Sequence, residues 1–144
     1  PAAIAEREWE TLRHMLRWTD QRRVDRDVSR STGPGNFVSV HLEFEHVTEV
    51  LTAFGERRLS AEAVAARVAQ EARRYLESEA PVGEHLADQL MLPLALLAGG
   101  RYRTLAPSAH ARTNAEVVNL FLPGAIRLEP SGDGAWLVTV AGRR

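Results

Sequence analysis

Residues 84–89 place an acid, an amide and an imidazole on one short segment. On a helix, His85, Asp88 and Gln89 share a face, because they are three and four positions apart. A carboxylate there could hold a divalent cation, an amide could bond a phosphate or a base, and an imidazole could stack on a base. An ordinary first helical turn, in which the helix dipole favours Glu84 and Asp88, is the alternative interpretation.

Residues 108–114 place a histidine among hydroxyl and amide side chains. We expect His110 in a loop between a strand and a helix, where Ser108, Thr113 and Asn114 can each bond its ring or cap the helix. A neutral imidazole can attack phosphorus directly and can later depart from it, which suits covalent transfer. The alternative is an ordinary loop histidine beside a helix cap.

The absence of lysine and cysteine limits which side chains could act as nucleophiles. All 18 basic residues are arginine and the chain has no cysteine, which excludes thiol catalysis, disulfides and cysteine zinc sites. Arginine stays protonated and is a poor nucleophile, so only histidine could carry a covalent intermediate on nitrogen. A GC-rich genome is a simpler explanation for the missing lysine.

Two other clusters are weaker candidates. His41, Glu43 and Glu45 would share one strand face and could suggest a metal site, but the solvated face of a half-buried strand is the favoured interpretation. Four arginines could contact RNA phosphates, although acidic neighbours dilute them and favour a solvated surface. These arginines are Arg22, Arg23, Arg26 and Arg30, and the acids are Asp20, Asp25 and Asp27.

Composition indicates a folded protein rather than a disordered one. The 144 residues, 44% of them hydrophobic, suffice for one domain or two small ones. No apolar run is long enough to span a bilayer. The net charge of −1 gives no global attraction to nucleic acid or membrane. Any contact with nucleic acid must therefore come from a local patch.

Hydrophobic periodicity predicts an α+β fold. In the first part we expect a helix over 4–18, strands over 38–44 and 47–54, and a helix capped by Ser60. The buried face of that second helix is predicted to carry Val64, Val68, Ala72, Tyr75 and Leu76. Pro81 and Gly83 end this part of the chain, so we place a boundary near residue 80.

The second part predicts a helix, a strand, a helix and a hairpin in that order. The first helix spans 84–97 and is interrupted at Pro93. A strand at 102–105 and a short helix at 114–122 follow. Strands at 126–128 and 136–140 flank the turn at 131–134, which is typical of a β-hairpin.

Several motifs resemble the RNA 3'-terminal phosphate cyclase family. The run Pro81-Val82-Gly83-Glu84-His85-Leu86-Ala87-Asp88-Gln89-Leu90 is similar to the family's nucleotide-binding motif. The pattern Ser108-x-His110-x-x-Thr113-Asn114 is similar to its nucleophile motif. Residues 33–36, 45–50 and 54–56 resemble further family segments. The resemblance therefore runs nearly from end to end, with the motifs in the family's order.

The resemblance implies an ATP-dependent ligase that converts RNA 3'-phosphate ends to 2',3'-cyclic phosphates, assisted by a divalent cation (Mg or Mn). His110 would be the adenylated nucleophile, and Asp88 would contact the metal near the triphosphate. Gln89 would contact the phosphates and His85 the adenine, where some relatives have tyrosine. The same nucleotide-binding segment would include Leu86 and Ala87.

The resemblance also implies a domain organisation. Residues 1–80 would be the family's inserted small α+β domain, without its first strand, and 81–144 the C-terminal catalytic unit of the large domain. Family chains are more than twice as long, so an N-terminal remainder is an expected partner, together with ATP and an RNA 3'-phosphate end. We also expect a cytoplasmic protein. Alone, the piece would be inactive. The alternatives are a non-catalytic cyclase-like scaffold of ribosome assembly, which would lack the nucleophile, and an isolated RNA-binding module.

Overall fold

The structure is a computed structural model that describes residues 2–26 and 32–142. The described residues form four helices and two small antiparallel sheets, which confirms the α+β prediction. The elements are α1 (Ala2–Leu16), β1 (Phe37–Glu43), β2 (Thr48–Phe54), α2 (Ala61–Glu77), α3 (Glu84–Leu96), β3 (Gly99–Thr104), α4 (Ala109–Phe121), β4 (Ile126–Gly132) and β5 (Ala135–Ala141). None of the described helices is both long enough and apolar enough to cross a membrane.

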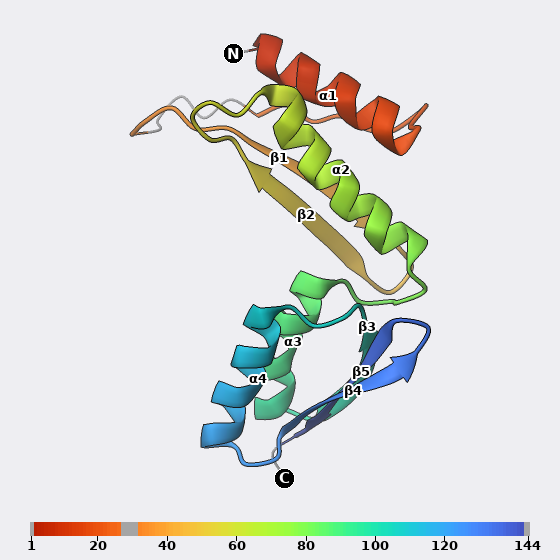
Figure 1. Cartoon of the computed structure of the whole chain (residues 1–144), viewed down its shortest axis with the longest axis vertical. Coiled ribbons are helices and arrows are strands. Elements are labelled where there is room, and N and C mark those ends of the chain that lie inside the picture. Colours follow the sequence, from red (N-terminus) through yellow and green to blue (C-terminus); the bar gives the residue numbers. More distant parts are fainter. Residues whose placement is uncertain (1, 27–31, 143–144) are drawn as a thin grey trace. The chain divides into compact units, whose positions relative to one another are not determined.

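The chain divides into two compact units, each with its own hydrophobic core (Figure 1). The first unit comprises Pro1–Phe44 and Val50–Leu76, and the second comprises Glu45–Glu49 and Glu77–Arg144. The segment 45–49 thus belongs to the second unit although the strand β2 continues into the first. The assignment of these parts to an inserted domain and a catalytic unit stays a prediction.

In the first unit, two helices cover one face of a two-stranded sheet. The four residues between β1 and β2 allow only an antiparallel pair, because a parallel pair needs a long crossover. Alternation along the strands buries Val38, Val40 and Leu51 against the helices. His41, Glu43 and Glu45 are all exposed, in agreement with the solvated-face interpretation.

Helix α2 begins as the sequence predicts and buries almost the predicted face. The Ser60 hydroxyl accepts a hydrogen bond from the Ala63 amide at 3.2 Å, as an N-cap does. The predicted face residues are buried, with the exception of Leu76, which is 48% exposed. That part of the prediction is wrong: at 100° per residue, Leu76 follows the buried Tyr75 and is rotated away from the core.

The second unit packs α3 and α4 on one face of a three-stranded antiparallel sheet (Figure 1). The strand order is β3-β5-β4, so the last strand lies in the centre. The core consists of Met91, Ala95, Ala111, Ala115, Val118, Ala125, Ile126, Val138 and Val140. Small alanines on both helices let the helix layer approach the sheet closely. This packing fixes where the first turns of α3 and α4 lie.

The predicted hairpin is confirmed. Strands β4 and β5 pair in antiparallel register, with Leu128 opposite Val138. The turn residues Gly132, Asp133 and Gly134 have φ values of 89°, 51° and 75°. The left-handed region favours glycine and tolerates aspartate, which explains why these residue types form the turn.

Strand β4 ends at Gly132 rather than at Leu128, and three further predictions for the second unit are wrong. Helix α3 runs through Pro93 to Leu96 without interruption, because Met91 and Ala95 on either side are buried against the sheet. Both Pro93 and Gln89 are exposed, so water can satisfy the Gln89 carbonyl that lacks a donor. Strand β3 begins at Gly99 rather than Tyr102, because Gly99–Ala141 pairing extends the sheet. The start of α4, the third error, moves His110 and is described below.

The arginine run is partly neutralised within the described residues. Arg23 forms ion pairs with Asp25 at 2.9 Å and with Glu6 at 2.7 Å, and it also lies over the Trp9 ring. These contacts support the interpretation of a solvated surface. Arg30 and Asp27 lie outside the described residues.

Candidate active site

The first turn of α3 is anchored by buried polar groups of the second unit. Gly83 is the N-cap, and its amide donates to Glu49 Oε1 at 2.5 Å. Glu49 is only 2% exposed, and a carboxylate beside a helix N-terminus is stabilised by the dipole. Thr104, which is also buried, donates to the Gly83 carbonyl at 3.5 Å. These contacts hold the segment that carries Asp88.

Strand β3 supports the same turn from another side. The Tyr102 hydroxyl donates to the Ala87 carbonyl at 2.5 Å. Burial, and secondarily the negative charge of Asp88, raise the pKa of the Tyr102 hydroxyl far above its usual value. Tyr102 therefore stays protonated and keeps its bond to the backbone next to Asp88.

Helix α4 begins at Ala109, so His110 lies in its first turn and not in a loop. The Ser108 hydroxyl accepts from the Ala111 amide at 3.1 Å, and two alanines follow among the first three helical residues. A good N-cap and strong helix formers start the helix five residues earlier than apolar periodicity indicates. The prediction of a loop for His110 is therefore wrong.

The structure brings the two motifs together through Asp88. Its Oδ2 lies 2.9 Å from His110 Nδ1. Its Oδ1 accepts from Asn114 Nδ2 at 2.8 Å, and the same amide lies 3.2 Å from the Asp88 backbone carbonyl. The Asp88 side chain is 18% exposed, whereas that of His110 is 82% exposed. Asp88 thus links α3 to α4 and fixes an accessible imidazole.

This geometry decides which ring nitrogen is reactive. A carboxylate accepts hydrogen bonds, so a neutral His110 must carry its proton on Nδ1 to bond Asp88. The lone pair is then on Nε2, which has no hydrogen-bond partner among the described residues. An imidazole with one nitrogen held by an acid and the other exposed is arranged as a nucleophile or a general base.

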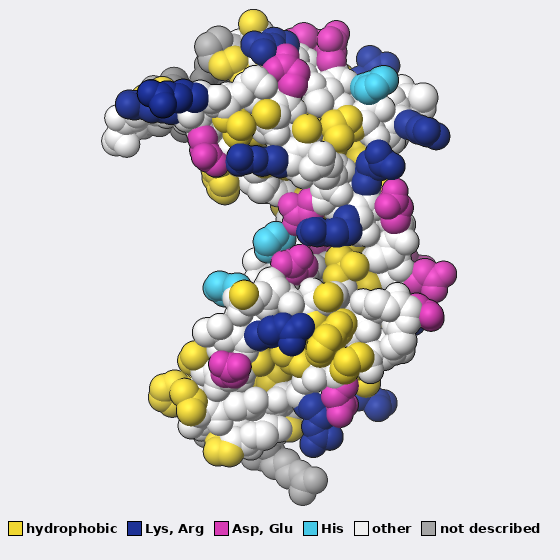
Figure 2. Space-filling view, in the orientation of Figure 1, with side chains coloured by type: hydrophobic (Ala, Val, Ile, Leu, Met, Phe, Trp, Pro, Cys, Tyr) yellow, Lys and Arg dark blue, Asp and Glu magenta, His cyan; other side chains and the backbone are white. Residues whose placement is uncertain are grey.

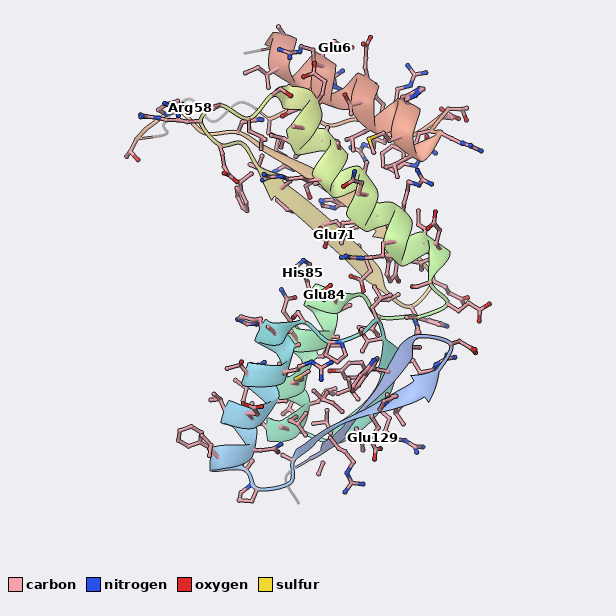
Figure 3. The ribbon with its side chains drawn as sticks, in the orientation of Figure 1. Glu6, Arg58, Glu71, Glu84, His85 and Glu129 are labelled. Carbon is pink, nitrogen blue, oxygen red and sulfur yellow. The ribbon has the colours of Figure 1, made fainter. Side chains whose placement is uncertain are left out.

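The remaining predicted residues lie on α3 as expected, at different depths. His85 and Gln89 are exposed, Leu86 is half-buried and Ala87 is 3% exposed. Figure 3 shows His85 beside Glu84 at the N-terminal end of α3. The link to His110 is made by Asp88, the fifth residue of α3.

Asp88 fits as one ligand of a metal ion whose remaining ligands are substrate phosphates and water. No cluster of three or more acidic or histidine ligands occurs in the part of the chain that the structure describes. Magnesium commonly takes one or two carboxylates and completes its shell with substrate phosphates and water. The two oxygens of Asp88 have lone pairs beyond those used by His110 and Asn114.

Sequence patterns did not indicate Glu49 or Tyr102 as residues of this site, and they gave Asn114 as a partner of the His110 ring or a helix cap rather than as a partner of Asp88. In β2 the Glu49 side chain is buried and the Val50 side chain is 48% exposed. Hydrophobic alternation along the sequence predicts the reverse, with Val50 buried and Glu49 exposed. Tyr102 was expected only as a strand residue. For Asn114, the spacing to Asp88 along the chain carries no signal, since they meet only when α3 and α4 pack together.

Comparison with protein families independently supports the relationship. The model of the RNA 3'-terminal phosphate cyclase (RTC) insert domain matches residues 1–77. This match covers the first unit and a little more than half of the chain. It is separate from the Asp88–His110 site, which follows it in the sequence. The chain belongs to the RNA 3'-terminal phosphate cyclase family.

Proposed function

We propose that this chain is the C-terminal part of an ATP-dependent RNA 3'-terminal phosphate cyclase and that His110 is its nucleophile. The single observation that carries the proposal is the 2.9 Å contact between Asp88 Oδ2 and His110 Nδ1 beside an exposed ring. Nothing in an ordinary helix cap requires an acid on one helix to orient a histidine on another.

In the first step, the lone pair of His110 Nε2 attacks the α-phosphorus of ATP. The new bond is P–N, the bond from that phosphorus to the bridging oxygen breaks, and pyrophosphate leaves with the electron pair. The imidazole becomes cationic as it is adenylated, and the Asp88 carboxylate stabilises that charge through Nδ1.

In the second step, an oxygen of the RNA 3'-phosphate attacks the adenylate phosphorus and the imidazole leaves. The neighbouring 2'-hydroxyl then attacks the terminal RNA phosphorus and AMP is displaced. The hydroxyl proton passes to solvent or to a base, and the product is a 2',3'-cyclic phosphate. His110 returns to its neutral form, still held by Asp88.

The N-terminal end of α4 favours the anionic substrate. Backbone amides and the dipole of α4 attract negative charge at the turn that carries His110. Arg112, exposed in the same turn, stacks over the Trp136 ring at 4.7 Å and adds a fixed positive charge. Gln89 would contact phosphates and His85 the adenine. Asp88 would also ligand a divalent cation bound to the triphosphate, which would supply charge neutralisation.

An N-terminal remainder of the enzyme is the proposed partner. Apolar side chains of α4 are exposed in the described chain, with Leu120 at 78%, Phe121 at 80% and Val117 at 45%. Such a patch on a helix usually packs against another part of the protein. We therefore expect this helix face to be covered when the remainder is present.

Cyclisation of RNA ends tests the overall reaction. An RNA bearing a labelled 3'-phosphate is incubated with ATP, Mg²⁺ and this chain combined with its N-terminal remainder. The expected product resists phosphatase, because a cyclic phosphate has no free monoester. His110→Ala is expected to leave the phosphate fully removable.

A scaffold of ribosome assembly is the competing function. It would bind RNA without consuming ATP, so neither cyclic phosphate nor AMP would form in the same mixture. That outcome, with a correctly folded complex, would reject the enzymatic proposal and leave family membership intact.

A further inference from the structure

An open groove of about 590 Å³ lies in the first unit, at the C-terminal end of α1. Its lining combines basic and aromatic side chains from α1, the segment after it and α2, namely Arg13, His14, Arg17, Trp18 and Arg73. Figure 2 shows basic and histidine side chains gathered over that end of the helix. The groove contains none of the residues assigned to ATP or to catalysis.

Among the described residues, two of the arginines that line this groove, Arg13 and Arg17, are not neutralised by neighbouring acids. The basic lining residues are exposed, and neither Arg13 nor Arg17 forms an ion pair with another described residue. Arg7 and Arg23 in the same unit are, by contrast, paired with carboxylates at 2.6 to 2.9 Å. Arg13 and Arg17 are therefore available to an anionic ligand.

The backbone at Arg17 provides an independent indication of function. The Trp18 amide donates to the Arg13 carbonyl at 3.0 Å and the Arg17 amide to the His14 carbonyl at 3.4 Å. This is the Schellman pattern of a helix end, in which glycine normally occupies the left-handed position. Here that position is Arg17, with φ of 54°. Arg58 has a similar backbone conformation but lines no groove, so it is the position of Arg17 in the groove, together with this strain, that suggests a ligand-binding role.

The same turn fixes an aromatic ring beside the arginines. Trp18 is half-buried, packs against the core of the unit and meets the Trp9 ring with centroids 6.3 Å apart. An indole and guanidinium groups that line one groove suit single-stranded nucleic acid, because bases can stack on the ring while arginines contact the phosphates. An acidic peptide would use the arginines but not the ring.

We propose that this groove binds the single-stranded RNA that precedes the reacting 3' end, with Arg13 and Arg17 on phosphates and Trp18 against a base. The site lies outside the chemistry proposed for His110 and needs no ATP. It adds a second RNA contact in the insert part of the chain. Since the whole chain has a net charge of −1, such a local patch must supply the attraction.

Binding of a fluorescent oligouridylate of about a dozen nucleotides, a length that spans one single-strand site, tests the proposal without ATP. The key variant is Arg17→Gly, which removes a charge and relieves the left-handed strain. Arg58→Gly is the matched control, because Arg58 is exposed in the same unit, has φ of 71° and does not line the groove (Figure 3).

Both variants are expected to keep or raise the melting temperature, since glycine suits both positions. Arg17→Gly is expected to weaken RNA binding about eightfold at about 50 mM salt and less than about twofold at about 500 mM, because each single-strand phosphate contact contributes a salt slope of about 0.7. Arg13→Gln should weaken binding similarly and Arg58→Gly should not.

Equal affinities for Arg17→Gly and Arg58→Gly, or polyglutamate that displaces the RNA at equal charge concentration, would overturn the proposal. A failed adenylation of His110 would not affect this result, because nucleotide is absent from the assay. The two proposals can therefore fail separately.

Discussion

At the scale of single residues, Asp88 connects most of the site. One carboxylate oxygen holds His110 and the other is fixed by Asn114. Asp88 thereby has two proposed roles, one in orienting the imidazole and one in binding a cation with ATP. The two roles respond differently to substitution and to metal concentration, so they can be separated.

Asp88→Asn is expected to reduce adenylation of His110 by at least about 10²-fold. In the parent protein Asn114 donates to Asp88 Oδ1, so the amide oxygen of the introduced asparagine would occupy the Oδ1 position. Its NH₂ group would then face His110 Nδ1. That arrangement stabilises the tautomer with the proton on Nε2, which is not nucleophilic. Rates of single-turnover adenylation check this.

The magnesium dependence of the same variant distinguishes the two roles. If Asp88 acted only as a cation ligand, excess Mg²⁺ or Mn²⁺ would restore the rate by mass action. We expect no such recovery. Asn114→Ala should lower the rate by about tenfold with an unchanged metal dependence, because it loosens the carboxylate without removing it.

The candidate site was predictable in its reactive members but not in their connections. The types and spacing of His110, Asp88 and His85 pointed to phosphoryl chemistry and to a family. The contact of Asn114 with Asp88 arises from the packing of two helices, which no local pattern encodes. Glu49 was obscured because a buried carboxylate contradicts the alternation of its own strand.

At the scale of elements, the start of α3 depends on a close approach between the backbone at Gly83 and the Glu49 side chain of β2. A Cβ atom on Gly83 would lie 2.6 Å from Glu49 Oε2, inside van der Waals contact. The backbone at Gly83 has φ of −74°, so the need for glycine here comes from space and not from conformation.

Gly83→Ala is expected to lower the free energy of unfolding by about 1–3 kcal/mol, because Glu49 cannot move without losing its bond to the Gly83 amide. Gly100→Ala is the matched control, since its Cβ would meet only the Leu94 methyls at 3.7 Å. Urea unfolding followed by circular dichroism measures both, and equal stabilities would contradict the packing described for α3.

Helix α1 contains a buried acid that should destabilise the fold at neutral pH. Glu8 is 4% exposed and accepts a hydrogen bond from Asn36 Nδ2 at 2.5 Å. Burial raises the pKa of Glu8 above its ordinary 4.5, and the Asn36 bond only partly opposes this. Between the pKa of Glu8 in the unfolded chain and its higher pKa in the folded chain, the folded state binds more protons than the unfolded state. The free energy of unfolding therefore falls as the pH rises through this interval to the folded pKa.

Glu8→Gln should therefore gain stability relative to the parent as the pH rises above 4.5, and show no such gain below it. Melting temperatures of both proteins across this range give the difference curve. The exposed Arg7–Glu62 pair, which lowers the pKa of Glu62 to about 2, is present in both and cancels. A difference that does not change with pH would contradict the assignment.

The order of elements followed from the sequence because each has a strong local signal. Ser60, the alternation around Val40 and the Gly-Asp-Gly turn predicted α2, β1 and the final hairpin correctly. Predicted boundaries were wrong for two reasons. At Pro93, tertiary packing outweighed the local tendency of proline to interrupt a helix. At Ser108, an N-cap started α4 before the residues of its apolar face.

At the scale of the whole molecule, exposed and buried residues of α4 should respond in opposite ways. Leu120→Ser with Phe121→Ser is expected to change the stability of this chain by less than about 0.5 kcal/mol per residue and to prevent association with the N-terminal remainder. Val118→Ala, at a 5% exposed position, should cost about 1–3 kcal/mol. Thermal melting and size-exclusion chromatography of the mixture test this.

Normal association of the Leu120/Phe121 double variant would mean that the remainder docks elsewhere. A large loss of stability in that variant would mean that these two side chains support the fold. Either result would remove the argument that α4 presents a surface to another part of the enzyme.

The most direct measurement is covalent labelling of this chain with α-labelled ATP and Mg²⁺, alone and combined with the N-terminal remainder. We expect label that is lost in acid, survives base and maps to His110 Nε2, appearing in the mixture and absent with His110→Ala. A folded mixture that takes up no label, or label that persists in His110→Ala, would contradict the assignment of His110 as the nucleophile.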